Sequence, residues 1–224
     1  MILTFMRHPP IDPGSERCIG QTNVDLSPEG RTALLPLAEE ACRLEPDKIL
    51  CSDLQRCQLL AEAIAARLGL FAEPDPVWRE VSFGTWENRT WNDIQAREPH
   101  VFSEWMTNFD TVAPPVGESF EKLQARVLTG VKGKIVGPTR DPEASPEPPA
   151  RPNTGETPLL HYLVITHAGV IRAAVSAFSG LPLRKAFDLP VPYGSHNSFC
   201  WDGNNWSPVD LVADRRIPSR ERAL

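Results

Sequence analysis

The sequence lacks several features that would place it in common functional classes. No apolar run approaches the roughly 20 residues that a membrane-spanning helix requires. Basic runs are also missing, and the formal net charge of −6 at pH 7 argues against a general nucleic-acid binder, which needs clustered Lys and Arg to meet the phosphate backbone. The apolar N-terminal segment is too short for a signal peptide. We therefore expect a cytoplasmic protein that binds neither a membrane nor a nucleic acid.

Cysteine is scarce and poorly placed for cross-linking. The chain has five cysteines, an odd number, and none of them form a CxxC pair. Such a set is a poor basis for a disulfide framework. Histidines at ligand spacing are missing near Cys51 and Cys57, so these two do not suggest a zinc site. The sequence predicts reduced thiols and no bound metal.

The apolar pattern that is present predicts an α/β fold. Short apolar runs at residues 2–6, 48–51 and 161–166 are typical of buried strands. Helical spacing predicts helices at 28–44 with a kink or break at Pro36, at 53–68 behind an N-cap at Ser52, and at 91–97, 101–107, 119–131 and 168–178. Strands that alternate with helices predict a three-layer α/β/α sandwich around a mostly parallel sheet.

The domain organisation follows from the remaining segments. Residues 197–201 and 206–211 predict a terminal hairpin. Residues 137–158 are rich in proline and lack apolar periodicity, which is typical of a surface insertion rather than a domain. We expect one domain over residues 1–214, with this insertion at about 137–158 and a tail at 215–224.

Two of the predicted strands end directly in a histidine, at His8 and at His167. Open α/β sheets bind their ligands at the edge where strands end, so both side chains are expected there. Arg7 and Arg56 also fall at strand-to-loop or strand-to-helix junctions. Guanidinium groups match the geometry of phosphoryl oxygens, and a few of them can hold one phosphate despite the negative net charge. These residues together indicate a phosphate site.

A phosphate ester also needs a general acid, because expelling an alkoxide is slow unless its oxygen is protonated. Glu80 precedes an aromatic, glycine-containing segment at 81–87. On composition alone, Glu80, Glu87 and Glu118 are equally good candidates for this acid. His100 and His161 we interpret as structural.

Six segments in order resemble the histidine phosphatase superfamily, also called the phosphoglycerate mutase-like fold. They are Met6-Arg7-His8, residues 18–30, Ser52-Asp53-Leu54-Gln55-Arg56-Cys57, residues 79–87, Gly117-Glu118-Ser119 and residues 166–172. The resemblance covers most of the chain. It is more specific than the Arg-His dipeptide alone.

The resemblance implies a role for each matching residue. His8 corresponds to the nucleophile that takes the phosphoryl group, and Glu80 to the proton donor. Arg7, Arg56 and His167 correspond to the phosphate pocket and act in catalysis with them. The substrate- and phosphate-binding residues implied in addition are Gln21, Thr22 and Ala168. This chemistry needs no metal and no cofactor, because cationic side chains stabilise the charge.

The chain departs from the usual family pattern at two places. Pro9 follows His8 where the family usually has glycine, and Thr166-His167-Ala168-Gly169 stands where Ser-His-Gly-Gly is more usual. Neither change removes a catalytic group. The Arg-His-Pro opening followed by Cys-x-Gly-x-Thr is closer to the alpha-ribazole phosphatase-like branch than to the glycolytic mutases.

The expected function is therefore hydrolysis of a small phosphorylated metabolite, with alpha-ribazole 5′-phosphate as one candidate. Two alternatives stay open: phosphoryl transfer of the phosphoglycerate mutase type, and a non-catalytic phosphate-binding scaffold. The oligomeric state also stays open, a homodimer being one arrangement. The intact set of Arg7, His8, Arg56, Glu80 and His167 argues against the scaffold.

Overall fold

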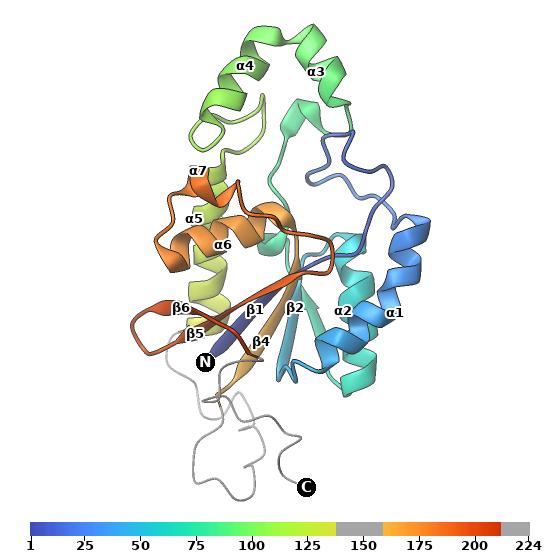
Figure 1. Ribbon diagram of the computed structural model, residues 1–224, viewed down its shortest axis with the longest axis vertical. Helices are drawn as coiled ribbons and strands as arrows, with labels where there is room; N and C mark the ends of the chain where they lie inside the picture. Colours follow the sequence, from blue (N-terminus) through green and yellow to red (C-terminus); the bar gives the residue numbers. More distant parts are fainter. Residues whose placement is uncertain (138–158, 212–224) are drawn as a thin grey trace, which may run out of the picture.

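The computed structural model describes residues 1–137 and 159–211 (Figure 1). One sheet has the strand order β3–β2–β4–β1–β5–β6. Its strands are β1 (Ile2–Arg7), β2 (Lys48–Cys51), β3 (Ala72–Pro74), β4 (His161–Thr166), β5 (His196–Trp201) and β6 (Trp206–Val209). The first four strands run parallel, whereas β5 is antiparallel to β1 and β6 to β5. The predicted mostly parallel sheet is confirmed.

Helices cover both faces of this sheet. The α-helices of the described residues are α1 (Pro28–Cys42), α2 (Gln55–Leu68), α3 (Trp91–Arg97), α4 (Pro99–Asn108), α5 (Phe120–Val131), α6 (Ala168–Ser179) and α7 (Leu183–Ala186). Figure 1 shows α1 and α2 on one side of the sheet and α5 and α6 on the other. The predicted three-layer sandwich is therefore confirmed. No helix among the described residues is long and apolar enough to cross a membrane.

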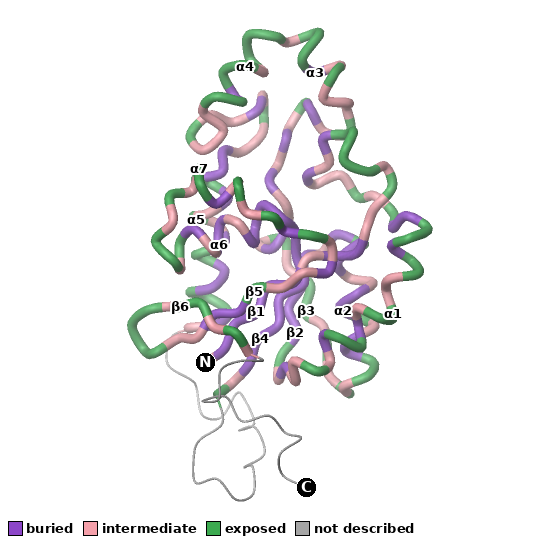
Figure 2. The backbone as a smooth tube through the Cα atoms, in the orientation of Figure 1, coloured by how far each residue is buried: buried purple, intermediate pink, exposed green. Residues whose placement is uncertain are grey.

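The core is divided by the sheet into two apolar clusters. Leu3 and Phe5 of β1 pack in the cluster that contains α5 and α6, and Met6 packs in the cluster that contains α1 and α2. This division follows from the strand geometry, because successive side chains point to opposite faces. Figure 2 shows β1, β2 and β4 as the buried centre of the molecule. β1 is thereby buried from Ile2 to Met6, directly before the site residues Arg7 and His8.

The predicted break in the first helix is wrong. α1 is continuous from Pro28 to Cys42 with Pro36 inside it. Proline removes one intrahelical hydrogen bond, from its own position to the carbonyl four residues earlier. Both Thr32 and Pro36 are exposed, so water can solvate the freed Thr32 carbonyl. The helix starts as expected for proline at its first position, with the Ser27 side chain accepting a hydrogen bond from the Gly30 amide.

The predicted N-cap of the second helix is also wrong. The capping residue of α2 is Leu54, whose side chain makes no capping hydrogen bond. Ser52 Oγ instead accepts from the Leu54 amide at 3.3 Å, and Asn23 Oδ1 accepts from the Gln55 amide at 2.9 Å. An asparagine from a distant loop thus replaces the local cap. The predicted end is correct, because Gly69 closes the helix in the left-handed conformation.

Short elements are the part of the fold that sequence periodicity does not predict. β3 and α7 contain only three and four residues, too few to show a period. Short 3₁₀ helices at Pro76–Trp78 and Gly84–Trp86, and a π-helical segment at Lys132–Val136, were likewise not predicted. The predicted hairpin forms as β5 and β6. The proline-rich stretch beyond residue 137 and the tail at 215–224 lie outside the described residues.

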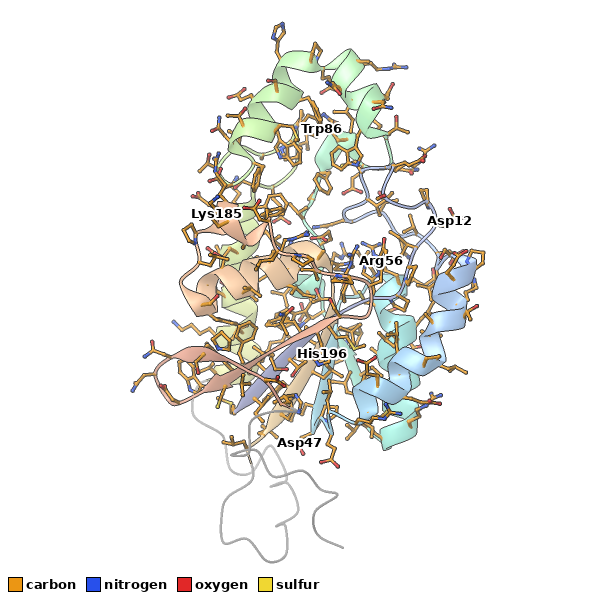
Figure 3. All side chains as sticks on the ribbon, viewed as in Figure 1. Asp12, Asp47, Arg56, Trp86, Lys185 and His196 are labelled. Carbon is orange, nitrogen blue, oxygen red and sulfur yellow. The ribbon has the colours of Figure 1, made fainter. Side chains whose placement is uncertain are left out.

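A cap formed by α3 and α4 lies beyond the carboxyl ends of the parallel strands (Figure 1). Its interior is aromatic: Trp86, Trp91 and Trp105 pack with Phe83 and Phe102, with ring centroids 5.5–6.5 Å apart. Figure 3 shows Trp86 within this cap and Arg56 between the cap and the sheet. Such packing gives the cap its own small apolar core.

Candidate active site

The register of β1 and β4 brings the two strand-end histidines together. Arg7 lies opposite Thr166 in neighbouring parallel strands, so the residues that follow them emerge side by side. The His8 amide donates to the Thr166 carbonyl at 3.0 Å. The ring centroids of His8 and His167 are 5.0 Å apart in an edge-to-face arrangement. Both histidines are buried.

A backbone hydrogen bond sets the tautomer of His8. Its Nδ1 lies 2.7 Å from the Pro9 carbonyl oxygen, which can only accept, so Nδ1 carries the proton. Burial lowers the pKa of His8 well below its usual range, and the nearby Arg56 guanidinium lowers it further. A neutral ring protonated at Nδ1 leaves a lone pair on Nε2. This nitrogen is therefore available as a nucleophile.

Arg56 is almost completely buried and is held by three acceptors. It lies in the first turn of α2, with a relative exposure of 1%. Its Nη1 donates to the Thr22 carbonyl at 2.8 Å and its Nη2 to the Gly20 carbonyl at 2.6 Å. Its Nε donates to His167 Nδ1 at 3.3 Å. These bonds fix the guanidinium plane, which presets it for an oxyanion ligand.

The carboxylate of Glu87 holds the loop that positions Arg56. It accepts hydrogen bonds from the amides of Gly20, Gln21 and Thr22 at 2.8–3.1 Å, and from the Thr22 hydroxyl at 2.6 Å. The Phe83 amide donates to it as well, at 3.1 Å. Gly20 is required here, because an added Cβ would lie 2.2 Å from the Val81 carbonyl oxygen and 2.4 Å from Glu87.

Arg7 retains an unused donor. Its Nη1 donates to the Val191 carbonyl, and its guanidinium carbon lies 3.8 Å from the centroid of the Tyr193 ring. Its Nε is buried and has no hydrogen-bond partner among the residues that the structure describes. Burial lowers the pKa of Arg7, while Tyr193 and Glu80 raise it. A buried cationic donor without a partner favours binding of an anion.

Glu80 is oriented by two backbone amides. Val81 donates to its Oε1 at 2.9 Å and Gly169 to its Oε2 at 3.0 Å. The close approach needs glycine at position 169, because an added Cβ would lie 2.2 Å from Glu80 Oε1. Of the three acids that composition leaves open, Glu87 holds the loop at 20–22 and Glu118 forms an ion pair with Arg126. Glu80 is the one that faces the histidines across a cavity.

That cavity, of about 330 Å³, brings together five of the predicted site residues. They are Arg7, His8, Arg56, Glu80 and His167. Two buried histidines, two arginines and one carboxyl group around one small cavity can hold a phosphate, attack it and protonate a leaving group. No group of three or more His, Cys, Asp or Glu residues is arranged as a metal site within residues 1–137 and 159–211.

The family to which this chain belongs can be read from its similarity to known proteins. The sequence profile of the histidine phosphatase superfamily (branch 1) matches residues 3–214. The chain belongs to this superfamily. Glucosyl-3-phosphoglycerate phosphatase from Mycobacterium tuberculosis is 30% identical over 209 residues, which cover 92% of this chain and 86% of that protein. This relative of the histidine phosphatase is named for a small phosphorylated metabolite.

Two further comparisons agree with this assignment. Adenosylcobalamin/alpha-ribazole phosphatase from Escherichia coli is 25% identical over 168 residues, covering 74% of this chain and 67% of that protein. The native structure of the mycobacterial glucosyl-3-phosphoglycerate phosphatase superimposes with a TM-score of 0.75 at 27% identity, covering 93% of this chain and 96% of the other. The relatives thus include phosphatases of two different phosphorylated metabolites.

Three residues that the resemblance implies as substrate contacts do not line the cavity of this histidine phosphatase. Thr22 directs its hydroxyl to Glu87, and Gln21 donates through Nε2 to the Glu80 carbonyl at 3.1 Å. Ala168 is likewise outside the cavity lining. The carbonyl of Thr22 nevertheless contributes, because it holds Arg56.

Other cavity residues are absent from the sequence-based set. Arg17, Arg172 and Tyr193 line the cavity, together with aromatic residues of the cap and of α7's flank. Arg172 lies in a segment that matches the family, but it carried no assigned role. Cys57 also contacts the site, with Sγ 3.5 Å from His167 Nε2. Arg17 and Tyr193 lie in loops, where no periodic pattern marks a side chain as facing the site.

Proposed function

We propose that this histidine phosphatase hydrolyses a phosphate monoester through a phosphohistidine on His8. The observation that carries the proposal is the bond from His8 Nδ1 to the Pro9 carbonyl, which leaves the Nε2 lone pair free in a cavity lined by the buried Arg56 and the half-buried Arg7. The neutral ring is supported by the burial that lowers the pKa of His8. A buried nucleophile, cationic donors and a carboxyl group form the set that phosphoryl transfer requires.

In the first step, His8 Nε2 attacks phosphorus and the bond between phosphorus and the ester oxygen breaks. Arg7, Arg56 and His167 donate hydrogen bonds to the three equatorial oxygens, where negative charge is concentrated in the transition state. Protonated Glu80 transfers its proton to the departing alkoxide, which leaves as an alcohol. The two amides that hold Glu80 keep its carboxyl group on the leaving-group side of the cavity.

In the second step, water attacks phosphorus and the phosphorus–nitrogen bond breaks. Glu80, now a carboxylate, accepts the proton of this water, and inorganic phosphate is released. His8 recovers its lone pair and Glu80 its proton, so the enzyme returns to its starting state. No residue other than these two needs to change its protonation.

The relatives supply two candidate substrates for this activity. The mycobacterial relative is a glucosyl-3-phosphoglycerate phosphatase, and the E. coli relative is an alpha-ribazole phosphatase. The sequence motif around Pro9 and Cys18 favours the second, whereas the higher identity favours the first. A screen of phosphorylated metabolites that includes both esters would rank them by kcat/KM. Isomerisation of 3-phosphoglycerate, measured beside phosphate release, would reveal mutase activity.

The test of the proposed function is His8→Ala. We expect turnover of 4-nitrophenyl phosphate to be lost, and the acid-labile phosphate that labelled substrate deposits on the wild-type protein to disappear. His100→Ala is the matched control, because His100 is exposed on α4. Full activity of a folded His8→Ala protein would exclude the proposal. Absence of a labelled intermediate in the wild type with every substrate would favour the scaffold.

A further inference from the structure

The arginines of this protein fall into two groups by their partners. Those away from the cavity largely pair with carboxylates: Arg31, Arg79, Arg89, Arg97, Arg126 and Arg184 each have an Asp or Glu oxygen within 4.0 Å. The four that line the cavity, Arg7, Arg17, Arg56 and Arg172, form no ion pair with any carboxylate in the described part of the chain. The cavity therefore carries uncompensated positive charge.

One phosphate does not use all of this charge. Arg7 at the end of β1 and Arg56 in the first turn of α2 line the cavity with His8. The single acidic residue among those lining the cavity is Glu80. A phosphate monoester brings at most two negative charges, which the first two arginines already balance. Arg172 is half-buried, and burial lowers its pKa, an effect that attraction to Glu80 offsets only in part. The charge of Arg172 is therefore available for a second anionic group.

Arg172 lies on the leaving-group side of the cavity. It belongs to α6 and stands three residues after Gly169, whose amide binds Glu80. Residues three apart on a helix lie on the same face, about 5 to 6 Å from each other. The charge of Glu80 raises the pKa of Arg172, in line with a position near the carboxyl group that protonates the departing oxygen.

Arg172 is also held in place with a donor to spare. Its Nε and Nη2 both donate to the Leu189 carbonyl, at 3.2 and 3.1 Å, and its guanidinium carbon lies 5.3 Å from the centroid of the Phe187 ring. Its Nη1 makes no hydrogen bond to any residue that the structure describes. The group is thus oriented by one carbonyl and one aromatic face while an edge stays free for an anion.

We propose that Arg172 binds a second anionic group of the substrate, carried by the leaving alcohol two or three carbon atoms from the ester oxygen. The proposal rests on the proposed function, because it needs Glu80 to mark the leaving-group side. An enzyme with this contact selects phosphate esters of hydroxy acids over phosphate esters of neutral alcohols. Alpha-ribazole 5′-phosphate, whose leaving group is neutral, ranks lower under this scheme.

The test uses two esters that differ at one position. The 3-phosphoglycerate molecule has a carboxylate where glycerol 3-phosphate has a hydroxymethyl group. Each is measured as a competitive inhibitor of 4-nitrophenyl phosphate hydrolysis, so the comparison does not depend on its own turnover. We expect the wild type to bind 3-phosphoglycerate about ten- to hundredfold more tightly, the range for a charge-assisted hydrogen-bonded pair.

The variants separate recognition from a structural role. In Arg172→Gln the ratio of the inhibition constants of glycerol 3-phosphate and 3-phosphoglycerate should fall to near one. The inhibition constant of glycerol 3-phosphate itself should change less than about threefold. Arg172→Lys should keep part of the preference, and Arg67→Gln, which removes an exposed charge on α2, should keep all of it. An equal loss for both esters would assign Arg172 to holding the Leu189 segment and overturn the proposal.

Two other outcomes are also decisive. A wild-type enzyme that binds both esters equally would overturn the proposal without any variant, even if Arg172→Gln does not fold. An enzyme that hydrolyses 4-nitrophenyl phosphate through His8 but shows no carboxylate preference would leave the proposed function standing and remove this inference alone. Failure of the His8 labelling experiment would instead remove the proposed function.

Discussion

Replacing Gly169 by alanine gives a sharp test of the role of Glu80, because the new methyl group would collide with one atom. The added Cβ would lie 2.2 Å from Glu80 Oε1 and 3.1 Å from its Cδ. Ordinary contact begins at 3.4 Å, so the carboxyl group must move by about 1 Å. The fold itself should tolerate the change. Gly169 lies in α6, where alanine is favoured over glycine by up to about 1 kcal/mol.

The expected loss follows from what a general acid contributes. Proton donation by a positioned side chain is worth about 10²- to 10⁴-fold in rate, and a misplacement of about 1 Å can cost about 10²-fold. We therefore expect kcat/KM for glycerol 3-phosphate to fall about 10²-fold or more in Gly169→Ala. For 4-nitrophenyl phosphate the loss in kcat/KM should be small, because kcat/KM covers only the steps through phosphorylation of His8, and 4-nitrophenolate leaves readily without a proton.

The assay is the ratio of kcat/KM values for the alkyl and aryl esters, measured in the wild type and four variants. Gly133→Ala is the matched control, because an added Cβ there meets nothing within 4 Å. Glu80→Gln should show the same leaving-group dependence as Gly169→Ala, and the double variant should lose no more than Glu80→Gln alone. A Gly169→Ala protein with the wild-type ratio would refute the assignment of Glu80 as proton donor.

Two further predictions concern stability and the loop at residues 20–22. Burial lowers the pKa of His161 to about 4. Between about pH 6.5 and pH 4 the unfolded chain therefore binds more protons at this residue than the folded chain does. As the pH is lowered through this window, the free energy of unfolding should fall by about 1 to 3 kcal/mol. His161→Gln should flatten this dependence in urea titrations; an unchanged slope would contradict the explanation. Glu87→Gln should lower the free energy of unfolding by about 2 kcal/mol, because an amide cannot accept from all the N–H groups that converge on the carboxylate. It should also weaken competitive inhibition by phosphate, since the same loop holds Arg56. The control is Glu104→Gln, exposed on α4, and equal urea midpoints and inhibition constants in the two variants would argue against this role for the loop.

The strand-end residues were predictable because their placement follows from local patterns. Apolar runs mark β1 and β4, and the rule that ligands bind at strand ends then places His8 and His167 at one edge. The structure confirms this edge through the register of Arg7 against Thr166. The pairing of β1 with β4 itself was not predicted, because strands about 160 residues apart leave no local pattern that marks them as neighbours.

The residues that sequence reasoning missed depend on contacts between distant loops. Ser52 has every local feature of an N-cap, yet Asn23 takes part of that role from another segment. Thr22 has the hydroxyl of a phosphate ligand, yet this hydroxyl donates its hydrogen bond to Glu87. Arg172 lies on a helix whose other positions are largely buried and apolar. Only the folded chain shows that it faces the cavity.

The bond between His8 and the Pro9 carbonyl places part of the proposed catalytic apparatus beyond the reach of side-chain mutagenesis. Every amino acid, proline included, carries that oxygen, so no substitution at position 9 deletes it. This explains why the usual glycine is dispensable there: the imidazole needs an acceptor from residue 9, not an amide donor or a small side chain. Chemical synthesis with a thioamide at this peptide unit would weaken the acceptor and shift the ring's tautomeric balance. An alanine scan, by contrast, would leave this carbonyl oxygen in place and would not detect its role.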